Sequence, residues 1–142
     1  MTKPTLDPTT DYPLSINRRD LLFTPTGKSI DDITLEAVMA GDIQATDLRI
    51  TPDTLRLQAE ISDKVGRPAL GDNLRRAAEM TAISDSRVLE IYNALRPNAS
   101  TKAELVAIAE ELTSQYNATH LADLVREAAD VYERRDILAE SE

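Results

Sequence analysis

Residues 101–138 read TKAELVAIAEELTSQYNATHLADLVREAADVYERRDIL, and this stretch decides the fold. Thr101 and Glu104 have the spacing of a capping box, which predicts that a helix begins here. Apolar side chains then recur every three or four residues, at Leu105, Ile108, Ala109, Leu112 and Tyr116. The pattern repeats from about Leu121 to Leu138, after Asn117. The stretch therefore predicts two antiparallel helices joined by a short turn.

The chain before this pair carries further helix signals, in which capping residues or prolines begin a segment and glycines or prolines end it. The segments are 35–40 between Thr34 and Gly41, 52–64 after Thr51, one opened by Pro68, and one from Ser84-Asp85 to a point before Pro97. Glycine is scarce and alternating β-branched runs are absent, which disfavours a sheet. We therefore expect an all-α fold, a compact multi-helix domain over residues 29–142.

Residues 1–28 differ from the rest of the chain. Pro4, Pro8, Pro13 and Pro25 fall here among several threonines. Proline removes a backbone donor and fixes φ, so the composition predicts an extended N-terminal arm separate from the helical domain.

Apolar side chains in this arm need a surface to pack on. We expect Tyr12, Leu14 and Phe23 to lie against a partner subunit. The alternative, which the sequence leaves open, is that the arm folds back on the core of its own chain.

The overall charge disfavours several classes of partner. Net charge is −9 and the sequence pI is about 4.6, whereas nucleic-acid binders usually present a basic face. An anionic membrane surface is disfavoured for the same reason, and no apolar run has the roughly 18 residues that a membrane span requires. There is no cysteine and no secretory signal is visible, which fits a cytoplasmic protein.

The sequence offers no complete catalytic set. His120 is the only histidine, so neither a metal site nor a nucleophile with its base can be assembled around imidazoles, and we expect a surface or capping role for it. Gly27-Lys28-Ser29 is similar to the end of a phosphate-binding loop, but Leu22 stands where the first glycine is needed. We therefore predict no catalytic, cofactor-binding or metal-ligating residue in this chain.

Six stretches are similar to one known family. They are DYPL at 11–14, DLRITPDTL at 47–55 with Gln58-Ala59, RRAAE at 75–79, IYNALRP at 91–97, STKAEL at 100–105 and VREAA at 125–129. In this order and spacing, from about Asp11 to Leu138, they resemble the small (gamma) subunit of adenosylcobalamin-dependent glycerol and diol dehydratases. The IYNALRP stretch is the most specific of the six.

The resemblance implies a lyase assembled as a dimer of heterotrimers of large, medium and small subunits. Such an enzyme converts glycerol to 3-hydroxypropionaldehyde, or 1,2-propanediol to propionaldehyde. The substrate and its metal ion lie in the large subunit, adenosylcobalamin lies between the large and medium subunits, and the small subunit is helical and non-catalytic. Only ten residues precede Asp11, so we expect a free cytoplasmic enzyme rather than one packaged in a microcompartment.

Two other interpretations remain. A free-standing helical adaptor would use the segment from Tyr12 to Phe23 to recognise an unrelated protein. A small hydrolase working with paired Asp and Glu residues is less favoured, because it needs a concave site in a core that is poor in aromatic residues.

Overall fold

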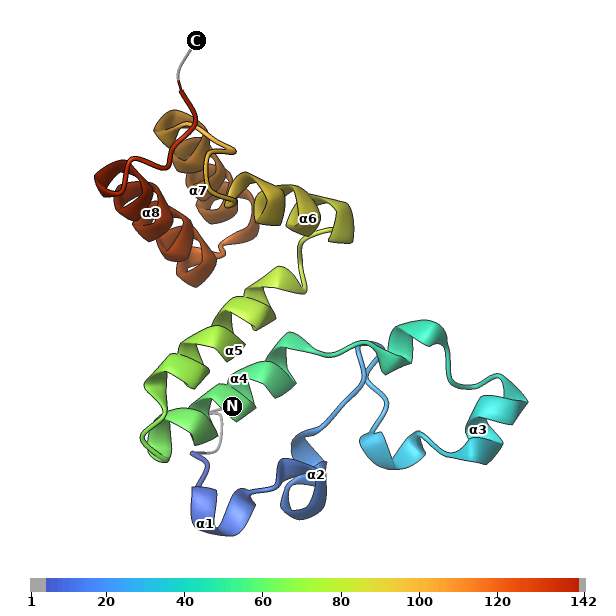
Figure 1. Ribbon diagram of the computed structural model, residues 1–142. Coiled ribbons are helices and arrows are strands. Elements are labelled where there is room, and N and C mark those ends of the chain that lie inside the picture. Colours follow the sequence, from blue (N-terminus) through green and yellow to red (C-terminus); the bar gives the residue numbers. More distant parts are fainter. Residues whose placement is uncertain (1–4, 141–142) are drawn as a thin grey trace. The chain divides into compact units, whose positions relative to one another are not determined.

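The computed structural model describes residues 5–140, whose backbone forms α-helices and short 3-10 turns. The helices are α1 (Pro8–Asp11), α2 (Leu14–Asn17), α3 (Leu35–Ala40), α4 (Pro52–Lys64), α5 (Pro68–Met80), α6 (Asp85–Ala94), α7 (Lys102–Tyr116) and α8 (Thr119–Arg134) (Figure 1). The 3-10 turns are Arg19–Leu21, Ile30–Asp32 and Ala45–Leu48. Within residues 5–140 the only β-structure is an isolated bridge between Phe23 and Ser29. The predicted all-α fold is confirmed.

The chain divides into two compact units, Met1–Ala78 and Glu79–Glu142. This division does not coincide with the boundary that we predicted after residue 28. The first helices of the arm belong to the same unit as α3 and α4.

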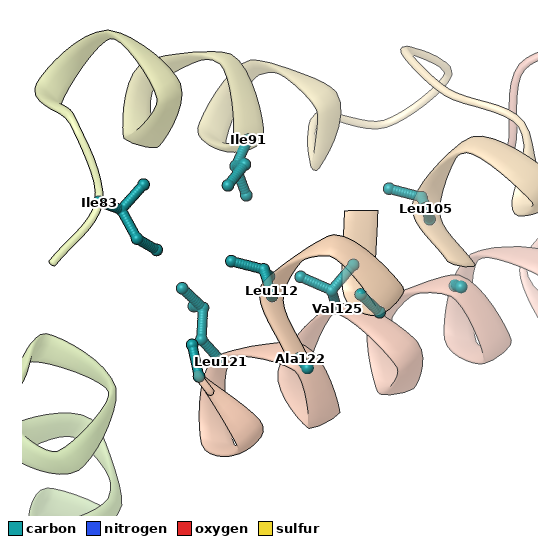
Figure 2. Packing of buried hydrophobic residues seen from close by; sticks show 10 residues of the cluster. Ile83, Ile91, Leu105, Leu112, Leu121, Ala122 and Val125 are labelled. Carbon is teal, nitrogen blue, oxygen red and sulfur yellow. The ribbon is translucent and has the colours of Figure 1, made fainter. Parts of the chain in front are cut away.

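The core of the second unit is built on α7 and α8, which pack side by side. Its buried side chains are Ile83, Ile91, Leu105, Ala109, Leu112, Ala118, Leu121, Ala122, Val125 and Ala129. Figure 2 shows Ile91 pointing from α6 toward Leu112, with Val125 and Ala122 beside them on α8. Several of these residues are alanines, whose short side chains let the helix backbones approach closely.

The predicted beginning of α7 is confirmed in detail. The backbone N–H of Thr101 donates to Oε2 of Glu104 at 2.8 Å, and Oγ1 of Thr101 accepts from the N–H of Glu104 at 3.3 Å. Asn117 ends the helix with a φ of 51°, in the left-handed region that asparagine tolerates well.

The end of α8 was predicted wrongly. The apolar pattern continues to Leu138, but the helix stops at Arg134 because Asp136 has a φ of 53°. The N–H of Ile137 then donates to the carbonyl of Tyr132 at 3.0 Å, and the N–H of Asp136 donates to that of Glu133 at 3.2 Å. This is the hydrogen-bond pattern of a Schellman motif, which reverses the chain and still returns Leu138 to the core.

The beginning of α8 is capped from a distance. Its N-cap residue is Ala118, which has no side-chain acceptor. Instead, Glu79 accepts from the N–H of Leu121 at 2.8 Å and from the N–H of His120 at 3.1 Å, and its Oε1 lies 2.8 Å from Nδ1 of His120. A carboxylate here satisfies donors that the helix leaves open and interacts favourably with the helix dipole. The expected capping or surface position of His120 is confirmed.

Replacement of Glu79 by alanine is expected to lower the free energy of unfolding by about 1 kcal/mol, the usual cost of losing a helix cap. Urea unfolding followed by circular dichroism measures the change. Glu110→Ala, at an exposed position of α7, is the matched control and is expected to have little effect. Equal losses in both variants would show that the cap does not contribute.

The predicted extended arm contains helices where it is described. Asp7 accepts a hydrogen bond from the N–H of Thr9 and begins α1, with Pro8 at the first helical position, where a missing N–H costs nothing. Pro13 is itself the N-cap residue of α2, which has no side-chain cap. Our prediction of an extended conformation is therefore wrong for 8–11 and 14–17, while residues 1–4 lie outside the described part.

Apolar residues of the arm form the core of the first unit together with α4. Leu6, Leu14 and Leu22 are buried against Leu57 and Ile61. These leucines pack on the core of their own chain, which is the alternative that the sequence left open.

Candidate subunit interface

The segment around α3 exposes large apolar side chains. We call residues 29–46 the α3 loop; Figure 1 shows it leaving the body of the first unit and returning to it. Leu35 is 73% and Met39 80% exposed, Val38 is also exposed, and α3 has no buried residue. A helix of six residues is far shorter than one that is stable alone in water. The α3 loop therefore offers apolar surface that nothing in the described chain covers.

The base of the α3 loop is closed by Asp47, whose side chain is fully buried. Its Oδ2 lies 2.7 Å from Nζ of Lys28 and accepts from the N–H of Gln44 at 2.8 Å. Its Oδ1 accepts from the hydroxyl groups of Thr24, at 3.0 Å, and Thr26. The network therefore joins the two ends of the loop at its base.

These contacts stabilise the ionised form of Asp47. The ammonium of Lys28 contributes most, followed by the Thr26 hydroxyl and the N–H of Gln44, and together they hold the pKa of Asp47 well below its usual range. Because the pKa is lowered on folding, the carboxylate stabilises the fold above the ordinary value of about 3.9. That contribution is lost as the pH falls from there toward the folded-state pKa.

Replacement of Asp47 by asparagine is expected to lower the thermal unfolding midpoint at about pH 6, because Lys28 loses its charged partner. The gap between the midpoints of wild type and variant is expected to narrow at about pH 3, because the carboxyl group of Asp47 is then mostly protonated in the unfolded wild-type chain while it is still ionised in the folded one. Thermal melts of both proteins at the two pH values measure this difference in unfolding midpoint. Asp42→Asn, at an exposed position of the same loop, is the control. A gap that does not change with pH would contradict the assignment.

A small hollow lies beside this network, with a volume of about 150 Å³. It is lined mainly by apolar side chains, among them Leu22, Phe23, Ile30, Ile33 and Ile50. A cavity of this volume in a protein core accepts a molecule of the size of benzene. The hollow is therefore large enough for one apolar side chain of another protein.

A second, larger hollow of about 460 Å³ lies between α4, α5 and the segment around Pro13. Tyr12 lines it and is exposed, as Phe23 is at the smaller hollow. Leu14, by contrast, is only 6% exposed and packs in the core of its own chain. Of the three predicted interface residues, Tyr12 and Phe23 are thus available to a partner, and their contact with one stays a prediction. Leu14 contributes to the core of the first unit and offers little surface to a partner.

The sequence did not point to the α3 loop as an interface. The structure places Leu35, Val38 and Met39 there, and exposes Leu48 and Ile50 just after it. A signal was present in the sequence: half of the residues of a six-residue helix are large and apolar, and so short a helix has little opportunity to bury them.

The part of the chain from residue 5 to residue 140 holds neither a metal-binding cluster nor a membrane-spanning helix. Among residues 5–140, no cluster of three or more His, Cys, Asp or Glu side chains is placed to hold a metal ion. No helix within residues 5–140 is both long enough and apolar enough to cross a membrane.

Comparison with known proteins gives consistent matches. The sequence profile of the dehydratase small subunit family matches residues 8–139. A propanediol dehydratase small subunit of Citrobacter freundii is 54% identical over 126 residues, which cover 89% of this chain and 73% of that protein. A propanediol dehydratase small subunit of Salmonella typhimurium is 53% identical over 125 residues, which cover 88% of this chain and 72% of that protein.

Proposed function

Because the chain belongs to the dehydratase small subunit family, we propose that it is the non-catalytic small subunit of an adenosylcobalamin-dependent glycerol or propanediol dehydratase. The enzyme dehydrates 1,2-propanediol to propionaldehyde or glycerol to 3-hydroxypropionaldehyde. The names of the two relatives support propanediol. The choice between the two substrates is made in the chain that holds the active site.

The α3 loop is the observation that carries this proposal. Leu35 and Met39 are exposed to an extent that is unfavourable for a chain that acts alone. The loop is nevertheless held at its base by the ion pair of Lys28 with the buried Asp47. An apolar surface on a fixed support is a preorganised docking site, which loses little conformational entropy when a partner binds.

We further propose that the partners are a large and a medium subunit in a dimer of heterotrimers, and that these subunits hold the cofactor. When bound, adenosylcobalamin supplies the radical that starts the dehydration. The described residues of this chain do not form a binding site for adenosylcobalamin. A corrinoid is much larger than either hollow, and the imidazole of His120 is already bound to Glu79. A cytoplasmic location belongs to the same proposal.

Reconstitution tests the proposal. The large and medium subunits are produced with and without this chain, and holoenzyme assembly is followed by size-exclusion chromatography with light scattering. We expect that omission prevents formation of the complete complex and of active enzyme, and that adding the purified chain restores both. Unchanged assembly and activity without the chain would reject the proposal and favour the free-standing adaptor.

A further inference from the structure

A second exposed surface lies on α6 in the other unit. Leu89 and Tyr92 are 62% and 63% exposed, and Arg96 is exposed just after the helix ends. Their spacing of three and four residues places them on one side of the helix. Ile91 points from the opposite side into the core, as Figure 2 shows. We call Leu89, Tyr92 and Arg96 the α6 face.

The α6 face has a fixed internal arrangement. The guanidinium carbon of Arg96 lies 5.6 Å from the centroid of the Tyr92 ring. A cation over an aromatic face at this distance is attracted to the ring, so each side chain restricts the other. The contact with the ring uses none of the five N–H donors of the guanidinium in a hydrogen bond to a carboxylate, so these donors are available to a partner.

Arg96 differs from the cations of the same unit that form salt bridges. Arg87 pairs with Glu90 and Glu111, and Lys102 pairs with Asp130 and Glu133. For Arg96, the described residues provide the Tyr92 ring and no carboxylate. Arg134 and Arg135 of this unit also form no salt bridge with the described residues, and Arg96 differs from them by its contact with an aromatic ring.

We propose that the α6 face is a second docking surface, on which Arg96 binds a carboxylate of a partner chain while Leu89 and Tyr92 pack on apolar groups beside it. The inference rests on the proposed role as a dehydratase subunit. It adds residues of the second unit, Glu79–Glu142, to the surface that contacts a partner subunit. Tyrosine and arginine are enriched among residues that dominate binding energy at protein interfaces. The guanidinium fork fits a carboxylate with two parallel hydrogen bonds.

A protein carboxylate fits this surface better than a nucleic-acid phosphate. Phosphate binding by proteins depends on several basic residues acting together. The α6 face has one arginine, and the acidic excess of the unit repels a polyanion. A single carboxylate within an apolar protein surface meets less repulsion.

The first test is charge reversal in the full chain. Arg96→Glu is expected to weaken binding to the large and medium subunits about tenfold or more. Arg135→Glu, an equal charge change at an exposed position after α8, is expected to leave binding nearly unchanged. Circular dichroism melts of both variants separate a binding defect from unfolding, and Arg96→Gln serves instead if Arg96→Glu does not fold. Equal binding by the Arg96 and Arg135 variants would overturn the proposal.

The second test identifies the chemistry of the partner group. Arg96→Lys places an amine on the α6 face, and a zero-length carbodiimide reagent joins amines to carboxylates that touch them. We expect mass spectrometry of the treated complex to find residue 96 joined to an Asp or Glu of a partner subunit. If the complex assembles and residue 96 forms no such link, the α6 proposal fails while the subunit assignment stands. If this chain does not enter the complex at all, the subunit assignment fails first.

Discussion

Replacement of both Leu35 and Met39 by serine is expected to prevent assembly of the dehydratase complex while leaving the fold of the chain intact. The two side chains are the most exposed large apolar groups among the described residues. Their removal therefore costs the free chain little, whereas a docked partner loses two apolar anchors. If each anchor contributes about 1.4 kcal/mol or more, the dissociation constant rises about a hundredfold.

Co-purification on a tagged large subunit measures this effect, and titration of the isolated variant into the other subunits gives the dissociation constant. Glu36→Ser, within the same short helix, is the matched control, because it changes an exposed polar residue of the α3 loop. Wild-type binding by the double variant would show that the loop is not the docking surface. Loss of binding in the control as well would indicate that loop conformation matters rather than its apolar groups.

Replacement of Leu112 by alanine is expected to cost about 2–5 kcal/mol of unfolding free energy, the range for leucine in a packed core. Leu112 is fully buried on α7, and Figure 2 shows it between Ile91 and Leu121. Its truncation leaves a cavity bounded by three helices, which cannot all move inward together. Denaturant unfolding measures the loss.

Leu124→Ala on α8 is the matched control, because the same atoms are removed from a side chain that is 37% exposed. We expect a much smaller loss there. If the two variants lose the same free energy, the tight packing of the α7–α8 core is not a main source of stability.

Features fixed within one turn of helix were predictable from the sequence. Thr101 and Thr34 cap helices through contacts with residues three positions further on, and Gly41 ends α3 through contacts three and four positions back, as expected. The end of α8 was missed because Asp136 gives no such signal. Asparagine and aspartate adopt positive φ more often than most residues, yet they do so in a minority of cases.

Features that join distant residues were not predictable. Glu79 caps a helix that lies 41 residues further along the chain, and Lys28 meets Asp47 across 19 residues. The residue types at these positions are common on wet surfaces, so composition does not distinguish them. Leu14 illustrates the same limit, because the sequence showed that it needs cover but not that α4 provides it.

The Lys28–Asp47 closure has a consequence for the amount of protein that a cell retains. A loop that is fastened only at its base and exposes its side chains is a preferred site for proteases. In an unassembled copy, the peptide bonds around Leu35 and Met39 are open to cleavage, and a docked partner would shield them. Excess copies would then be degraded while assembled ones persist, so the supply of partner chains would set the level of this one.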